Sequence, residues 1–167
     1  MRFHLKEILH VPGASLPFES QLDLSDLDFY GERPFAHPIV IHGTVRNMAG
    51  ALMLEGSADT TLELVCDRCL KPFRQELRLP VSTLLAETLE DEENDEIVLL
   101  EDGAVDLDEV FTTALVLSMD SKHVCDQDCK GLCATCGANL NEGPCGCRKE
   151  IDPRLAALAQ LLDKENE

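Results

Sequence analysis

The stretch LELVCDRCLKPF, residues 62–73, links two segments in which apolar and polar residues alternate. Upstream, residues 52–64 carry apolar or small residues at every second position, and downstream residues 73–85 largely repeat the pattern. A period of two is typical of strands with one buried face, and short connections favour antiparallel pairing. The sequence therefore predicts a β-hairpin that carries Cys66 and Cys69 at its tip.

The same alternation begins earlier in the chain. Residues 39–45 form a third alternating run, and the turn residues 47–50 separate it from the second. Residues 2–9 and 16–24 are weaker strand candidates that could extend the sheet or lie across it. We therefore predict that residues 1–86 form a β-rich part built on an antiparallel meander.

The pattern changes after residue 86. Residues 87–96 contain seven acidic residues in ten, which favours a solvated linker, predicted over 87–104, although such blocks also serve as tails for basic partners. Asp106 and Glu109 then have the spacing of a capping box, and apolar residues follow at helical spacing. We predict a helix over 105–120.

The C-terminal residues 151–167 predict a second helix. Asp152 and Pro153 fit the N-cap and first helical position, and leucines follow at helical spacing. This apolar stripe would pack in the core or dock a partner. The predicted fold class is α+β: an antiparallel meander, a cysteine-rich segment over 121–150 and a C-terminal helix, in one unit spanning 1–167.

Composition limits the functional classes. With 14 Lys and Arg against 32 Asp and Glu, the net charge of −18 argues against a broad nucleic-acid-binding face and against anionic membranes. The first eight residues lack an apolar leader core, and no stretch is long and apolar enough to span a membrane. We therefore expect a cytoplasmic protein, whose closely spaced thiols bind metal more readily than they form disulfides.

The 8 cysteines fall into four close pairs. Thiolates are soft ligands that select zinc over hard cations, and four of them form a closed structural site with no open coordination position. We therefore predict two structural Zn²⁺ ions. The predicted ligands are Cys66, Cys69, Cys125, Cys129, Cys133, Cys136, Cys145 and Cys147.

Chain length favours one partition of these ligands. Cys133, Cys136, Cys145 and Cys147 close a short loop, which costs little entropy, and the other four would join the hairpin tip to the distant cysteine-rich segment. Partitions that mix the pairs stay open. His123 precedes Cys125 by two residues and is an alternative ligand.

Basic residues cluster near the cysteines despite the acidic total. If zinc joins the two segments, they could form a small patch for RNA phosphates or an acidic protein surface; otherwise they are scattered surface charges. The candidates are Arg68, Lys71, Arg74, Lys130, Arg148 and Lys149.

Catalytic motifs are absent from the sequence. It has no nucleophile elbow, no phosphate-binding loop with lysine and no H-E-x-x-H. We expect no enzymatic activity and no small-molecule substrate. An open zinc site would be needed for the competing hypothesis, a metalloenzyme.

Two strings resemble the YceD family, also called the large ribosomal RNA subunit accumulation protein family. They are residues 62–73 and residues 125–155, which contain C-x3-C-K-G-L-C-x2-C-G-x-N-L-N, C-G-C and D-P-R-L. The early run 22–27 and the acidic linker also fit the cysteine-rich branch of the family. Ala134 and Ser118 stand where proline is common.

The resemblance implies a role in large-subunit assembly and ribosomal RNA accumulation, through binding of a large-subunit ribosomal protein or of precursor ribosomal RNA. An acidic protein suits basic ribosomal proteins. The alternative function is a redox-switched zinc-thiolate chaperone, in which oxidation would release zinc and unfold the cysteine-rich segment.

Overall fold

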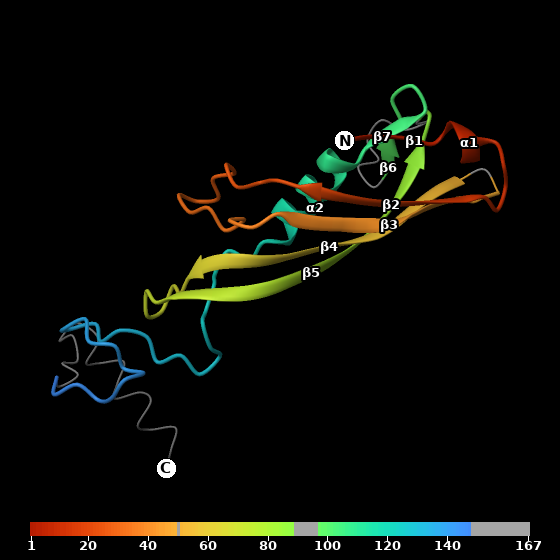
Figure 1. Cartoon of the computed structure of the whole chain (residues 1–167). Coiled ribbons are helices and arrows are strands. Elements are labelled where there is room, and N and C mark those ends of the chain that lie inside the picture. Colours follow the sequence, from red (N-terminus) through yellow and green to blue (C-terminus); the bar gives the residue numbers. More distant parts are fainter. Residues whose placement is uncertain (50, 89–96, 148–167) are drawn as a thin grey trace, which may run out of the picture.

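A computed structural model describes residues 1–49, 51–88 and 97–147 (Figure 1). Its main element is a five-stranded sheet with the strand order β2-β3-β4-β5-β6. Strands β2 to β5 pair in antiparallel fashion, whereas β6 pairs with β5 in parallel. The strands are β2 Ser15–Leu22, β3 Ile39–Met48, β4 Ala51–Val65, β5 Pro72–Ala86 and β6 Ile97–Leu99.

A second sheet has two short strands and pairs the N-terminal strand with a strand about 100 residues further along the chain. It joins β1 (Arg2–His4) to β7 (Ala104–Asp106) in antiparallel register. The short helix α1 (Lys6–Leu9) follows β1, and α2 (Leu107–Ser118) follows β7. Among the described residues, no helix has the length and hydrophobicity needed to cross a membrane.

The antiparallel meander predicted from the alternating runs is confirmed. The inward-facing apolar residues of the alternating pattern in β3 and β4 are buried, among them Ile39, Ile41, Leu54 and Leu62. Helix α2 agrees with the predicted helix over 105–120 within two residues at either end. The predicted C-terminal helix over 151–167 lies outside the described residues.

Two predictions are corrected. Residues 6–9, proposed as strand, form α1, in which Leu5 and Ile8 are both buried three positions apart. Strand β6 lies inside the range predicted as a linker, 87–104. A strand of three residues is too short to show an alternating pattern. A parallel strand pair is joined by a long connection rather than a tight turn, so no turn signal in the sequence predicts β6.

The core lies between one face of the sheet and the α-helices. Phe18 is its central aromatic side chain, because its ring contacts those of Phe3 and Phe111 edge to face at 5.7 and 5.9 Å. Gly43 and Gly56 lie opposite each other on β3 and β4. A Cβ atom at Gly43 would lie 2.7 Å from the Phe18 ring, so the glycine pair makes room for that ring.

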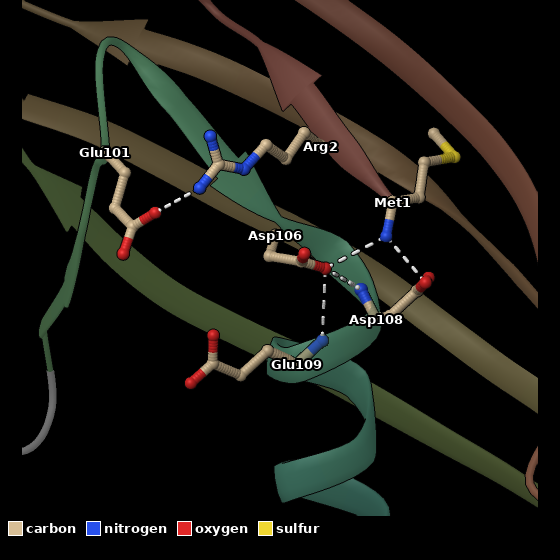
Figure 2. Close-up of polar contacts among 6 residues, drawn as sticks. All are labelled: Met1, Arg2, Glu101, Asp106, Asp108 and Glu109. Atoms are coloured by element: carbon tan, nitrogen blue, oxygen red, sulfur yellow. Dashed lines mark hydrogen bonds and ion pairs between the residues drawn. The ribbon is translucent and has the colours of Figure 1, made fainter.

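Helix α2 begins at an aspartate cap that also contacts the chain's first residue (Figure 2). The Asp106 carboxylate accepts hydrogen bonds from the backbone N–H groups of Asp108 and Glu109. The Met1 ammonium donates to Asp106 and to Asp108. These contacts hold the pKa of Asp106 below its usual value, chiefly through the hydrogen bond from the ammonium. The cap therefore fixes α2 relative to β1.

Strands β4 and β5 extend beyond the rest of the sheet. They pair from Leu52 and Leu85 to Val65 and Pro72, whereas β3 accompanies β4 only between Asp59 and Ala51. We call the distal part, residues 60–77, the two-stranded arm. It projects toward the cysteine-rich segment, and Cys66 and Cys69 lie in the turn at its tip, as predicted (Figure 1).

Candidate metal centre

Eight sulfur atoms gather in two groups of four. The first cluster is Cys66, Cys69, Cys125 and Cys129, and the second cluster is Cys133, Cys136, Cys145 and Cys147. Within each group the ligand atoms lie within 4.8 Å of one another. The structure thus groups the sulfurs in the partition that loop length favours.

The first cluster has the dimensions of a tetrahedral thiolate site. The Sγ atoms of Cys66 and Cys129 are 3.8 Å apart, and those of Cys69 and Cys125 are 3.6 Å apart. Four sulfurs around zinc at about 2.3 Å would lie about 3.8 Å from each other. A disulfide would need about 2.05 Å, and all eight cysteines are free. The residues therefore fit a Zn(Cys)4 centre.

Burial distinguishes the ligands of the first cluster from ordinary surface thiols. The exposed fractions of Cys66, Cys69 and Cys129 are 0%, 6% and 5%. Burial opposes ionisation of Cys66, but the backbone N–H groups of Cys125, Cys69 and Arg68 donate to its sulfur and lower its pKa to about 6. Backbone donors aimed at sulfur favour a thiolate, which is the form that binds metal.

The thiols of this cluster cannot all ionise easily without a cation. Burial, followed by the neighbouring sulfurs of Cys66 and Cys69, raises the pKa of Cys125 to about 12. One anionic sulfur therefore disfavours the next, as expected for like charges in one site. A divalent cation at the centre would remove this conflict, because it stabilises all four thiolates at once.

Backbone contacts hold the arm tip against the cysteine-rich segment. The Asp67 carboxylate accepts from the His123 backbone N–H at 2.6 Å, and the Asp67 N–H donates to the His123 carbonyl at 2.9 Å. The Leu132 N–H donates to the carbonyl of Arg68 at 3.0 Å. The first cluster therefore lies where two backbone–backbone hydrogen bonds and one backbone–carboxylate hydrogen bond already join two distant segments.

Arg68 has a structural role at this junction. Its Nη1 donates to the carbonyls of Gln127 and Cys129 at 3.2 and 3.0 Å. Arg74 is likewise engaged, because it pairs with Glu63 at 2.8 Å on the arm. Lys71 and Lys130 are exposed, and Arg148 and Lys149 lie outside the described residues. Two of the six candidate partner-binding cations are thus occupied within the chain.

Asn141 connects the two clusters. It belongs to the loop between the second-cluster ligands Cys136 and Cys145, yet its Nδ2 lies 3.3 Å from the Sγ of Cys129. Its Oδ1 accepts from the Lys130 N–H at 2.7 Å. A donor placed on a ligand sulfur stabilises the thiolate and orients it. Asn141 is the residue at this site that sequence reasoning missed, although it stands in the quoted G-x-N-L-N string.

The second cluster is local and more exposed. Cys136 and Cys147 are exposed, while Cys133 and Cys145 are half-buried. Backbone N–H groups of Cys136 and Thr135 lower the pKa of Cys133 to about 6. The neighbouring Cys136 side chain, followed by burial, raises the pKa of Cys147 to about 12. Both clusters therefore show the same division between easily and reluctantly ionised thiols.

The residue after each C-x-x-C pair adopts a left-handed backbone conformation. Gly137, which follows Cys136, has φ of 72°, as its sequence position suggests. Leu70, which follows Cys69, has φ of 57° although it carries a side chain, and that side chain is 64% exposed. The turn geometry is thus shared by both pairs even where the sequence lacks glycine.

His123 is not part of either group of ligand atoms found among the described residues. Its described contacts, both to Asp67, are made by its backbone N–H and carbonyl rather than by the ring. Four sulfurs complete each cluster without it. The alternative in which His123 replaces a thiolate therefore has no geometric support.

The fold and the two clusters define a class of small β-sheet protein in which a hairpin tip meets a cysteine-rich segment through paired four-cysteine groups. Residues 54–162 match the family described as the large ribosomal RNA subunit accumulation protein YceD. The chain belongs to this YceD family.

Relatives match over most of the chain. An uncharacterized protein of Mycobacterium tuberculosis is 32% identical over 172 residues, covering 99% of this chain and 76% of the relative. The chloroplastic large ribosomal RNA subunit accumulation protein YCED homolog 1 of Zea mays is 32% identical over 154 residues, covering 73% of this chain and 52% of the relative. Its Arabidopsis thaliana counterpart is 27% identical over 162 residues, or 78% and 50%. No solved structure gives a significant match.

Proposed function

We propose that this chain is a non-enzymatic, cytoplasmic, zinc-binding factor that supports assembly of the large ribosomal subunit. The observation that carries the proposal is membership of the YceD family, whose plant members are named for accumulation of large-subunit ribosomal RNA. The cysteine clusters support a structural metal, because four sulfurs at tetrahedral spacing leave no position for water or substrate.

The charge of the molecule favours a basic protein as the direct partner over RNA. The net charge is −18, and of the four candidate cations that the structure describes, Arg68 and Arg74 already bind groups within the chain, which leaves Lys71 and Lys130. Phosphate binding needs free lysine or arginine. An acidic surface would instead attract a basic ribosomal protein and hold it before it joins the subunit.

Cells that lack the protein test this role. We expect a lower ratio of large-subunit to small-subunit ribosomal RNA, restored by the wild-type chain. A tagged chain should recover a large-subunit protein, or precursor RNA if RNA is the partner. An unchanged RNA ratio, together with recovery of neither component, would refute the proposal. Asp26→Asn, which changes a fully exposed charge that belongs to neither cluster, serves as a folded control.

The redox-switched chaperone is a second candidate, favoured by the exposure of Cys136 and Cys147. Hydrogen peroxide would take two electrons from a pair of thiolates, form a disulfide and be reduced to water, and the cluster would release its metal. Retention of both metals under peroxide, with no change in protection of a client protein from aggregation, would exclude this function.

A further inference from the structure

A groove lies beside α2, and none of the eight cysteines lines it. It has a volume of about 840 Å³ and is lined by β5, β6, β7 and one face of α2. Its apolar lining includes Val98 and Leu99 of β6 and Val110, Ala114 and Leu117 of α2. The three helix residues follow one another at spacings of four and three, so they form one continuous stripe.

The stripe ends in side chains that the described fold leaves uncovered. Leu117 is 80% exposed and Leu99 is 49% exposed, although both line the groove. Scattered surface leucines need no explanation, but apolar residues gathered in one groove are typical of a binding site. Val110, by contrast, is buried, with an exposed fraction of 9%, so the stripe runs from the core outward.

The edge of the groove is acidic. Glu87, Glu101, Asp106 and Glu109 line it, and Arg2 is the one basic residue among the described residues of the lining. Arg2 forms an ion pair with Glu101, and the Met1 ammonium forms an ion pair with Asp106 (Figure 2). Among the described residues, Glu87 and Glu109 have no ion-pair partner. The groove therefore combines an apolar floor with uncompensated negative charge.

We propose that this groove binds a cationic segment of a partner protein, whose apolar side chains contact Leu99 and Leu117 while its lysines or arginines face Glu87 and Glu109. Charge complementarity decides the occupant. Nucleic acid and anionic lipid would be repelled by the acidic edge. A second copy of this chain is disfavoured because it would bring two acidic edges together. Residues 151–167 of this chain are disfavoured as well, because they carry four acidic residues against two basic ones.

The inference deepens the proposed function, on which it rests for the identity of the partner as a ribosomal component. Basic proteins with apolar anchors have the chemistry that this groove selects. The binding property itself is tested without any ribosomal component.

The probe is a fluorescein-labelled 12-residue peptide of alternating lysine and leucine, titrated into the full metal-loaded chain at low salt. We expect saturable binding with one peptide per chain. Leu117→Glu removes the exposed anchor while adding negative charge, so weaker binding by this variant would identify the apolar contact. Met48→Glu makes the same change at another exposed apolar residue, 57% exposed, and should bind like the wild type.

The charge contribution is tested with a matched pair of double variants. Glu87→Gln with Glu109→Gln should weaken binding about five-fold, the effect of losing two exposed ion pairs. Glu19→Gln with Glu55→Gln changes the net charge equally at exposed strand positions and should have little effect. Amide chemical shifts of the ¹⁵N-labelled chain should change at Val98, Thr113 and Leu117.

Several results would overturn the inference. These are the absence of saturable binding, equal weakening by both double variants, shift changes confined to the cysteine clusters, and a dimer that Leu117→Glu dissociates. If the peptide does not bind but loss of the protein still lowers large-subunit RNA, the groove inference alone fails. If the peptide binds as expected and the RNA ratio is unaffected by loss of the protein, the proposed function fails instead.

Discussion

The two cysteine clusters have the same composition but different positions in the fold. The first draws ligands from the arm tip and from a segment 56 to 63 residues away, and three of its four cysteines are buried. The second draws all of its ligands from residues 133–147, and none of them is buried. One cluster therefore joins distant parts of the chain, and the other closes a local loop.

Because the two clusters lie at different places in the fold, metal binding should have a different structural effect at each. Metal in the first cluster would reinforce the contact between the arm and the cysteine-rich segment, which the Asp67 and Arg68 hydrogen bonds also hold. Metal in the second cluster would order its own loop and position Asn141. Loss of the first should release a tertiary contact, whereas loss of the second should loosen one loop.

The largest effects are expected from Cys66→Ser and Cys147→Ser, which remove one ligand from the first and the second cluster respectively. Each should reduce bound zinc from about two ions to about one, because three thiolates bind a structural ion poorly. Only Cys66→Ser should expose the Leu132 N–H, which otherwise donates to the Arg68 carbonyl. Native mass spectrometry counts the metal, and amide hydrogen exchange follows Leu132. Equal loss of Leu132 protection in both variants would contradict the assignment.

Limited chelation should separate the clusters in the wild-type chain. Because Cys136 and Cys147 are exposed, a chelator should reach the second cluster first and remove about one zinc before the other. Zinc release can be followed with a colorimetric chelator while hydrogen exchange reports which loop opens. Release of both ions in a single phase would show that the clusters do not differ in access.

Asn141→Leu should weaken the first cluster although the residue lies in the loop of the second. Loss of a donor to a ligand typically lowers metal affinity about 10- to 100-fold. The expected result is weaker binding at the first cluster, measured by competition with a chelator and by the cobalt-thiolate absorption of the cobalt-loaded chain. Glu142→Gln is the comparison, because the Glu142 carboxylate accepts from Asn139 and contacts no sulfur in the described contacts. Unchanged metal affinity of the first cluster in Asn141→Leu would contradict the proposed role of Asn141 in connecting the two clusters.

The smallest effect, on the free energy of unfolding, is expected from Asp106→Ala. Because Asp106 belongs to neither cluster, this variant also serves as a control for the metal measurements. Loss of an N-cap costs about 1 kcal/mol at pH 7, without change in bound metal. The pKa of Asp106 is held below the usual 3.8, so its stabilising contribution is present above that value and disappears as the pH falls through the lower folded pKa.

Denaturant unfolding at pH 7 and near pH 3 checks this prediction. The difference in free energy of unfolding between the wild type and Asp106→Ala should shrink in acid. Glu19→Ala, at an exposed strand position, should change it by less than about 0.5 kcal/mol at either pH. A difference that grows in acid would contradict the role of the ionised carboxylate.

The sequence predicts the meander and the cysteine grouping because both depend on local spacing. Alternation identifies β3 to β5, and the short loop from Cys133 to Cys147 identifies the second cluster. The engagement of Arg68 by two carbonyls is not predictable in this way, since it arises only when the tip meets residues 127–129. The parallel strand β6 and the contact of Asn141 with Cys129 likewise depend on distant segments.

The length of the two-stranded arm has a consequence for solubility. Among the described residues, β6 covers β5 only at Leu84–Ala86, so the edge from Pro72 to Thr83 has no strand beside it. An open edge invites pairing with other chains and hence aggregation. Pro80 lacks a backbone N–H to offer along this edge, and Arg74 and Arg78 place charges on it. These three residues make the free edge of β5, which continues from the arm into the main sheet, a poorer template for intermolecular sheets.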